Sequence, residues 1–271
     1  MIDSSYLLVC AIAFAAMFGG GMIGILAARA LPEHHLSDAS ATVVKLAAAV
    51  VVSLTSLVLA LMLSSANSSF SANAGIVKKL SSDLIHLDHL LRVYGPDANA
   101  ARADLRAYAT KKNDELFGVS KAPATTNRAT TNRVTTVSET ANRETADQLD
   151  ALLDAVVSLS PADRRQTALV TQAQFLIDNI YAERWLLWEN PGPTVPAQFL
   201  FVLIFWLALI YVSFGLFAPA NLPVIASFFL SALAVAGAVL LILELGDPVH
   251  HGWFQVSSEP MRRAVVEIGR P

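Results

Sequence analysis

The sequence has little charge and a single cysteine, and these shortages exclude several classes of protein. Lys, Arg, Asp and Glu make up 15% of its 271 residues, whereas soluble domains usually carry about a quarter charged residues. The lone thiol, Cys10, has no second cysteine with which to form an intrachain disulfide. A net charge of −3 gives no sign of nucleic-acid binding. We therefore expect no nucleic-acid partner.

The sequence also lacks the short motifs that carry common catalytic chemistry. It contains no Gly-Lys-Ser phosphate loop, no Gly-x-Ser-x-Gly elbow and no His-Glu-x-x-His pair. We therefore expect neither an enzyme nor a bound cofactor. His86 and His89 are candidate metal ligands because they lie three residues apart on one expected helix. A hydrated helix face is the favoured interpretation, since no cysteine or second strong cluster accompanies them.

The charge that is present is segregated along the chain. Four stretches are almost free of it, namely residues 6–30, 43–63, 197–217 and 222–245. A bilayer core of about 30 Å needs roughly 20 apolar residues at helical rise, which each stretch approaches. Inside lipid the backbone polar groups must bond within the segment, so each stretch should be a helix. The pattern predicts an all-α integral membrane protein with four transmembrane helices. The first stretch lacks a basic start and is too long for a signal peptide, so we expect it to be retained.

Most charged residues lie between residues 66 and 190, which predicts a helical soluble domain inserted between spans 2 and 3. Ser160-Pro161 is typical of a helix start, with Ser as the cap and Pro at the first helical position. Whether the soluble helices form their own bundle or extend the spans stays open. The expected divisions are a transmembrane hairpin, a soluble domain, a second hairpin and an amphipathic tail, over residues 1–64, 65–196, 197–246 and 247–271.

Two further segments between and after the spans have distinctive composition. The tandem Ala-Thr-Thr-Asn-Arg repeats within residues 119–137 predict a mobile linker. The tail is expected to lie on the soluble domain or at the membrane interface through Met261, Val265, Val266 and Ile268.

The distribution of basic residues around the spans predicts the orientation. One side carries Lys78, Lys79, Arg184, Arg262 and Arg263, whereas the other offers Arg29 and Lys45. The positive-inside rule therefore places the soluble domain and both termini in the cytoplasm.

Small residues recur every fourth position along the first span, at Ala16, Gly20, Gly24 and Ala28. This spacing lines one helix face with small groups and lets a second membrane helix approach closely. We favour helix packing over a role in permeation for this face.

The second span carries a polar stripe. At about 100° per residue, one sector holds Lys45, Ala49, Ser53, Ser56, Ala60 and Ser64. A lysine near the mouth of a span, aligned with hydroxyls, suits a water-filled anion path. Alternatively, Lys45 extends to the lipid headgroups while the serines pack or bond back to their own helix. Both interpretations stay open.

Glu244 ends the fourth span, one turn before Gly246-Asp247-Pro248. A carboxylate at that depth needs a partner. It either has a structural role, such as capping the amides of a neighbouring helix, or lines a vestibule and binds cations.

The last third of the chain carries a set of residues that points to a known family. They include Gly215, Asn221, Glu244, Pro248 and Gly252, with Ser257-Ser258 following. The sequence resembles the bacterial bestrophin-like proteins, also catalogued as the domain of unknown function DUF4239.

The resemblance implies a homo-oligomer in the bacterial inner membrane, a pentamer by analogy with the distantly similar bestrophins. Bestrophins are ion channels whose second span lines a narrow hydrophobic neck. Here the pore would be lined by Lys45, Ser53, Ser56, Ala60 and Ser64, or by a hydrophobic gate of Leu54, Leu57 and Leu61.

The function that we expect is an oligomeric ion channel that passes small inorganic ions, with chloride as the favoured ion. The alternative is a non-conducting membrane scaffold or sensor whose soluble helices bind a partner or ligand. In that case the serine and glycine stripes serve only as packing surfaces.

Overall fold

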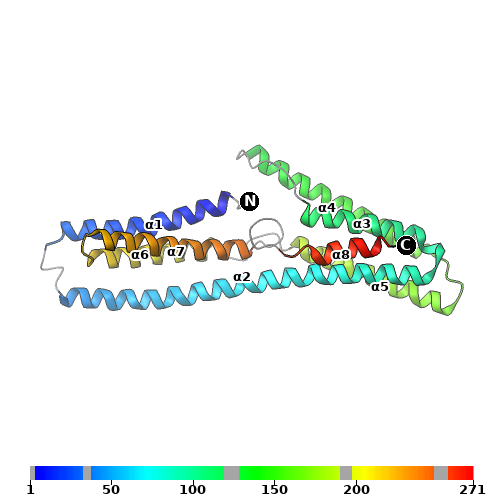
Figure 1. Ribbon diagram of the computed structural model, residues 1–271, viewed down its shortest axis with the longest axis horizontal. Helices are drawn as coiled ribbons and strands as arrows, with labels where there is room; N and C mark the ends of the chain where they lie inside the picture. The colour runs from blue at the N-terminus through cyan, green and yellow to red at the C-terminus, as the bar shows by residue number, and fades with distance from the viewer. Residues whose placement is uncertain (1–3, 33–37, 119–127, 190–196, 247–255, 271) are drawn as a thin grey trace. The chain divides into compact units, whose positions relative to one another are not determined.

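The computed structural model describes residues 4–32, 38–118, 128–189, 197–246 and 256–270. Within these ranges the regular structure is helical and contains no strand, which confirms the all-α fold class. The α-helices, shown in Figure 1, are α1 (Ser4–Ala30), α2 (Asp38–Tyr94), α3 (Asn99–Phe117), α4 (Arg128–Val157), α5 (Arg164–Glu189), α6 (Ala197–Leu216), α7 (Leu222–Gly246) and α8 (Glu259–Ile268). A short 3-10 helix, η2 (Pro96–Ala98), precedes α3.

Helices α1, α2, α6 and α7 are long and apolar enough to cross a membrane. They coincide with the four stretches of low charge, so the chain has the helices of a multi-pass membrane protein in contact with lipid.

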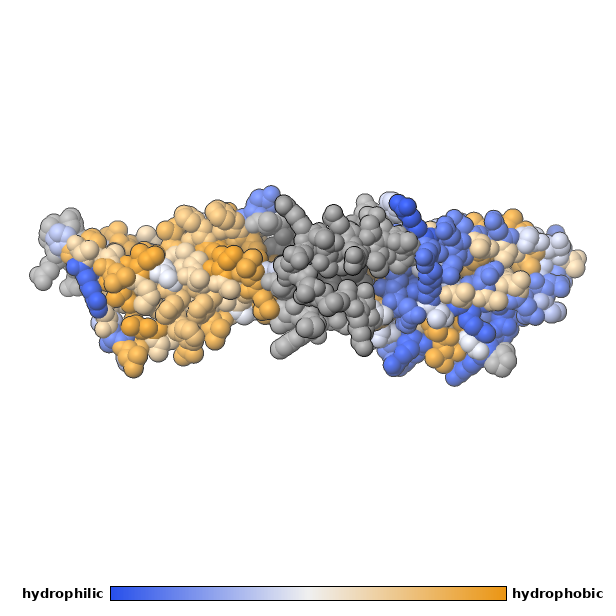
Figure 2. Space-filling model, turned by 90° about the horizontal axis from the view of Figure 1, so that it is seen from above, coloured by the Kyte–Doolittle hydropathy of each residue, from blue (hydrophilic) through white to orange (hydrophobic). Residues whose placement is uncertain are grey.

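The chain divides into two compact units. Unit 1 comprises Met1–Ser71 and Gly192–Gln255, and unit 2 comprises Ala72–Pro191 and Val256–Pro271. Hydrophobic residues dominate the visible surface of unit 1, whereas hydrophilic residues dominate that of unit 2 (Figure 2). The hydrophobic surface of unit 1 suits contact with lipid, and the hydrophilic surface of unit 2 suits contact with water.

In unit 1, helix α1 packs against both α6 and α7. A Cβ atom added to Gly20 would lie 3.0 Å from the Ala208 carbonyl oxygen, and one added to Gly24 would lie 2.3 Å from that of Val212. These two glycines therefore lie where α1 meets α6, which confirms the packing interpretation of the small-residue face. The apolar core around this contact includes Met17, Leu203, Leu207 and Val239.

Helix α2 continues without a break from the second apolar stretch into the first soluble helix. Its buried residues in unit 1 are Ala41, Ala48, Thr55 and Met62, spaced seven positions apart, followed by Ala66. In unit 2 the buried side continues through Val77, Leu80, Leu84, Leu87 and Leu91. Both arrangements left open by the sequence occur, because the first soluble helix extends a span and the soluble helices also pack on one another. Gly95, with a φ of 119°, follows the end of the helix.

Unit 2 is a set of packed helices with an aliphatic core. Helix α3 packs on α4 and α8, and α4 packs on α5. Fully buried side chains come from α2, α3, α4 and α5, among them Leu84, Leu105, Leu152 and Ile177. Helix α8 of the tail packs on the soluble helix α3, so the tail lies on the soluble helices, which is one of the two positions expected for it. Met261 and Ile268 of α8 are buried, but Val266 is 58% exposed, so its expected contact is wrong.

Two local predictions are corrected in unit 2. Residues 128–137 belong to helix α4, so the linker expected over 119–137 is wrong for that part, while 119–127 lie outside the described residues. Extending an existing helix costs less than nucleating a new one, and this allows Thr-rich residues to join the amphipathic helix that follows them.

The second correction concerns the start of α5. The cap is Asp163 rather than Ser160, because the Asp163 carboxylate accepts a hydrogen bond from the Gln166 amide at 2.6 Å. The Gln166 side chain in turn accepts one from the Ala162 amide at 2.7 Å. This reciprocal pair satisfies amides that the helix itself leaves free.

Candidate functional site

The predicted pore-lining residues all lie on the unit 1 part of α2 and are exposed. At about 100° per residue, Ser53, Ala60 and Ser64 lie roughly opposite the buried Thr55 and Met62, whereas Lys45 lies close to the buried Ala48. The gate candidates Leu54, Leu57 and Leu61 are 47–62% exposed, and Leu54 and Leu61 lie about 100° from the buried Thr55 and Met62, on the flank of the helix. In the single chain both sets are exposed, although Lys45 also lines a pocket with residues of α6 and α7.

Helix α2 is the least covered of the four candidate spans. Only 17% of its apolar window is buried, against 33%, 28% and 22% for α1, α6 and α7. Its buried stripe at Ala48, Thr55 and Met62 is narrow because those positions are seven residues apart. Most of the circumference is therefore free to contact lipid, water or another copy of the chain.

Two hydroxyl groups in the apolar part of α2 donate hydrogen bonds to the backbone of their own helix. Ser53 Oγ donates to the Ala49 carbonyl oxygen at 3.0 Å, and the buried Thr55 hydroxyl donates to Val51 at 2.7 Å. Such bonds to the preceding turn satisfy a hydroxyl in apolar surroundings. To bind an anion, the Ser53 hydroxyl would have to rotate away from its own helix.

Lys45 lines a pocket of about 280 Å³ in unit 1, near the connection between α6 and α7. The other lining residues are Ser213, Phe214, Phe217, Ala218, Val224, Ser227 and Phe228, so lysine supplies the only charge. The pocket combines one cation and two hydroxyls with aromatic walls. An anion is the ligand that this lining would favour.

Two of the family-pattern residues, Gly215 and Asn221, have structural explanations. A Cβ on Gly215 would lie 2.3 Å from the Gly21 carbonyl oxygen, so this glycine permits the contact between α6 and α1. Asn221 caps α7, because its side-chain oxygen accepts a hydrogen bond from the Val224 amide at 3.1 Å. Pro248 and Gly252 lie outside the described residues.

Glu244 is 3% exposed near the end of α7, and its Oε1 atom is buried without a hydrogen-bond partner. Sequence reasoning expected either a capping role or a vestibule role. A buried carboxylate oxygen without a donor is costly, and neither expected role is visible among the described residues.

The candidate metal ligands His86 and His89 are both exposed on the unit 2 part of α2. The described residues hold no group of three or more His, Cys, Asp or Glu side chains that could bind a metal ion. The neighbouring acids, Asp83 and Asp88, are turned into unit 2 and form ion pairs there.

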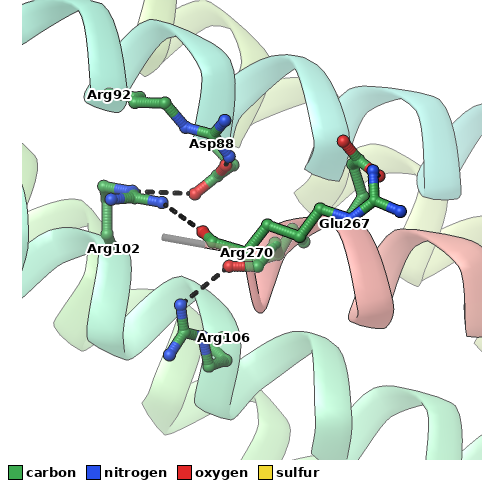
Figure 3. Close-up of polar contacts among 7 residues, drawn as sticks. Asp88, Arg92, Arg102, Arg106, Glu267 and Arg270 are labelled. Carbon is green, nitrogen blue, oxygen red and sulfur yellow. Dashed lines mark hydrogen bonds and ion pairs between the residues drawn. The ribbon is translucent and has the colours of Figure 1, made fainter.

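Asp88 is the centre of an ion-pair network in unit 2 (Figure 3). Its carboxylate accepts hydrogen bonds from Arg92 at 2.7 Å and from Arg102 at 2.9 Å. Arg102 also donates to the carbonyl oxygen of Arg270 at 3.3 Å, and Arg106 donates to that of Ile268 at 2.8 Å. These carbonyls end α8, so the arginines of α3 satisfy groups that the helix leaves free and hold the tail.

Sequence reasoning missed this network. The i,i+4 spacing of Asp88 and Arg92 was a readable signal. Arg102, by contrast, lies beyond the Gly95 turn, and its contact with Asp88 depends on how the chain reverses there.

Glu183 of α5 forms a second charged centre with α2. Its Oε1 lies 2.6 Å from Lys79 Nζ, and Lys79 lies 3.7 Å from Asp83 Oδ2. Burial is the main cause that raises the pKa of Glu183 to about 7, with the Asp83 carboxylate adding to the rise and Lys79 opposing it.

A third polar group joins α3 and α4. The Lys112 ammonium is buried and lies 2.8 Å from Glu115, whose other oxygen accepts a hydrogen bond from Thr145. Burial lowers the pKa of Lys112, while Glu115 opposes the change. Unit 2 therefore has charged groups inside an otherwise aliphatic bundle.

Comparison with known proteins supports the resemblance seen in the last third of the chain. The profile of the Bestrophin-like domain matches residues 15–261, which is most of the chain. Neither the comparison with curated proteins nor that with solved structures gives a significant match. The matched region begins within α1 and includes α2, α6, α7 and the soluble helices between them, and the chain therefore belongs to the Bestrophin-like family.

Proposed function

We propose that this protein is an oligomeric ion channel in which each copy contributes the unit 1 part of α2 to a shared pore. The observation that carries the proposal is the exposure of that helix. Its polar residues Lys45, Ser53 and Ser56 and its leucine row are uncovered in the single chain, and its span is the least buried. An association of copies around α2 would cover this surface.

The proposed ion is an anion, chloride in the first instance. One lysine per chain becomes a ring of positive charge in a symmetric assembly, and such a ring raises the local concentration of anions. No Asp or Glu occurs between Lys45 and Ser64 to offset it. Serine hydroxyls would replace part of the hydration shell of a passing ion.

Leu54, Leu57 and Leu61 provide the proposed gate. These leucines form one exposed row, and a ring of such rows would make a hydrophobic constriction. Narrow hydrophobic constrictions block ions when they lose their water, so small rotations of α2 would be enough to open or close the path. By the basic-residue distribution, the proposed site of action is the bacterial inner membrane with unit 2 in the cytoplasm.

Ion flux into liposomes that contain the purified oligomer tests the proposal. We expect chloride-dependent flux, and we expect Lys45→Glu to shift the reversal potential in planar bilayers toward cation preference. Lys78→Glu is the matched control, since Lys78 is an exposed lysine of the same helix outside the apolar stretch. Lys45→Arg should keep the anion preference.

The second candidate is a non-conducting membrane scaffold or sensor. The bond from Ser53 to its own helix favours this alternative because it leaves that hydroxyl without need of water. A monodisperse oligomer that gives no ion-dependent flux would support the scaffold and contradict the channel. An unchanged reversal potential in Lys45→Glu would remove Lys45 from the pathway.

A further inference from the structure

In unit 2 the buried Glu183 of α5 and the partly buried Asp83 of α2 both face the ammonium group of Lys79. Their side chains are 3% and 15% exposed. Glu183 Oε2 and Asp83 Oδ2 are both buried and have no hydrogen-bond partner. Each acid therefore has one oxygen that lacks a donor, and an unpartnered buried oxygen is costly.

A single cation serves both acids. Lys79 donates to Glu183 Oε1 at 2.6 Å but lies 3.7 Å from Asp83 Oδ2, which is beyond hydrogen-bonding distance. The Lys79 side chain is also 59% exposed, so water weakens its effect on the buried pair. Two ionised carboxylates would leave a net negative charge inside the bundle.

Among the described residues, the other elements around this centre do not supply a second cation. Tyr108 of α3 interacts electrostatically with Glu183, and its hydroxyl is buried without a partner. Arg184, the neighbour of Glu183 on α5, donates instead to the Asn142 backbone and side chain. On the α8 side, Met261 contacts Ser81 of α2, while Glu259 pairs with Arg262 and Arg263 of its own helix.

We infer that the Glu183 carboxyl, which lies beside Asp83, holds a proton near neutral pH and releases it when the pH rises. The proton supplies the donor that the two unpartnered oxygens lack, because a protonated carboxyl donates to the neighbouring carboxylate. Adjacent carboxylates cannot both ionise cheaply in a buried site. Burial raises the pKa of Glu183 to about 7, which agrees with a proton held on this carboxyl near neutral pH.

Release of the proton would place two negative charges opposite one exposed ammonium. The repulsion acts between α5 and α2, so the contact between these helices loosens as the pH rises. Helix α2 is continuous from Asp38 to Tyr94 and carries both Asp83 and the proposed pore-lining residues. A consequence for ion flux follows only if the proposed channel function holds, whereas proton binding does not depend on it.

Infrared difference spectroscopy on the full-length oligomer tests the proton site directly. The carbonyl stretch of a protonated carboxyl should disappear between about pH 6 and about pH 8, a range in which ordinary acids are fully ionised. Glu183→Gln should abolish this titration. Glu144→Gln is the matched control, because Glu144 also pairs with a lysine, Lys111, but is more than half exposed.

Two results would overturn the inference. One is the absence of any carboxyl titration in this range in the unmodified protein, and the other is a titration that persists in Glu183→Gln. Flux provides a second, separate measurement. A pH response in the unmodified protein that is lost in Glu183→Gln supports the coupling, whereas unchanged conduction across this range contradicts it. A protein that conducts at neither pH contradicts the channel and leaves the infrared result to decide the proton site.

Discussion

Gly24 of α1 and Gly215 of α6 meet backbone to backbone. A Cβ added to Gly24 would lie 2.9 Å from the Gly215 Cα, and one added to Gly215 would lie 3.1 Å from the Gly24 Cα. Each added atom would also lie 2.3 Å from a backbone carbonyl oxygen of the facing helix. This contact explains why position 215, which belongs to the bestrophin-like pattern, is a glycine.

We expect Gly24→Ala and Gly215→Ala each to destabilise unit 1 by about 1–3 kcal/mol, the usual cost of overpacking. Backbone atoms, unlike a flexible side chain, cannot move aside without separating the helices. Thermal unfolding of the detergent-solubilised protein measures the effect. Gly19→Ala is the control, because no atom lies within 4 Å of the added methyl there. Equal stability of the Gly24 and Gly19 variants would contradict the close contact.

Asp88→Asn should destabilise unit 2 because Arg92 and Arg102 would lose the charged carboxylate with which they pair. Arg102 is 15% exposed, so removal of the Asp88 charge leaves a largely buried guanidinium without its partner. The expected cost is about 3 kcal/mol, at the low end for a broken buried pair because Arg92 is partly in water. The exposed Asp97, changed to Asn, should shift stability by less than about 0.5 kcal/mol.

Hydrogen exchange separates local from global effects of the same substitution. Arg102 also holds the Arg270 carbonyl, so the backbone amides of α8 should exchange faster in Asp88→Asn. Unchanged protection of α8 would show that the Asp88 network does not hold the tail.

The stability of unit 2 should fall as the pH rises from about 4.5 to about 7 on account of Glu183. The folded state raises the pKa of this carboxyl from 4.5 to about 7, so in this range it holds a proton that the unfolded chain has lost. Above about pH 7 both states are ionised and the contribution levels off. Denaturant unfolding of the unmodified protein and of Glu183→Gln at several pH values gives the difference. The variant should lose this fall, and parallel curves would contradict the assignment.

The spans could be predicted from the sequence because charge depletion over about 20 residues is a strong local signal. The packing of Gly20 and Gly24 was also readable from their spacing. The continuity of α2 was not, since no cap or break marks the end of its apolar part. Contacts such as Glu183 with Lys79, which are 104 positions apart, depend on how the helices assemble. The helix over residues 128–137 was missed because their threonine-rich composition weighed against a helix, whereas extending α4 costs less than nucleating a new helix.

The most direct test of the account is the water accessibility of the exposed α2 face in the assembled oligomer. In a Cys10→Ser background, cysteines at Ser53, Ser56 and Ala60 should react with a charged, membrane-impermeant thiol reagent. Cysteines at the buried Ala48 and Met62 should not react, nor should one at Leu230 of α7, which is 63% exposed in the chain and is expected to face lipid. Reaction at the α2 face alone is the predicted result. If Ser53, Ser56 and Ala60 are as unreactive as Leu230, that face contacts lipid or protein and the pore is not lined by α2.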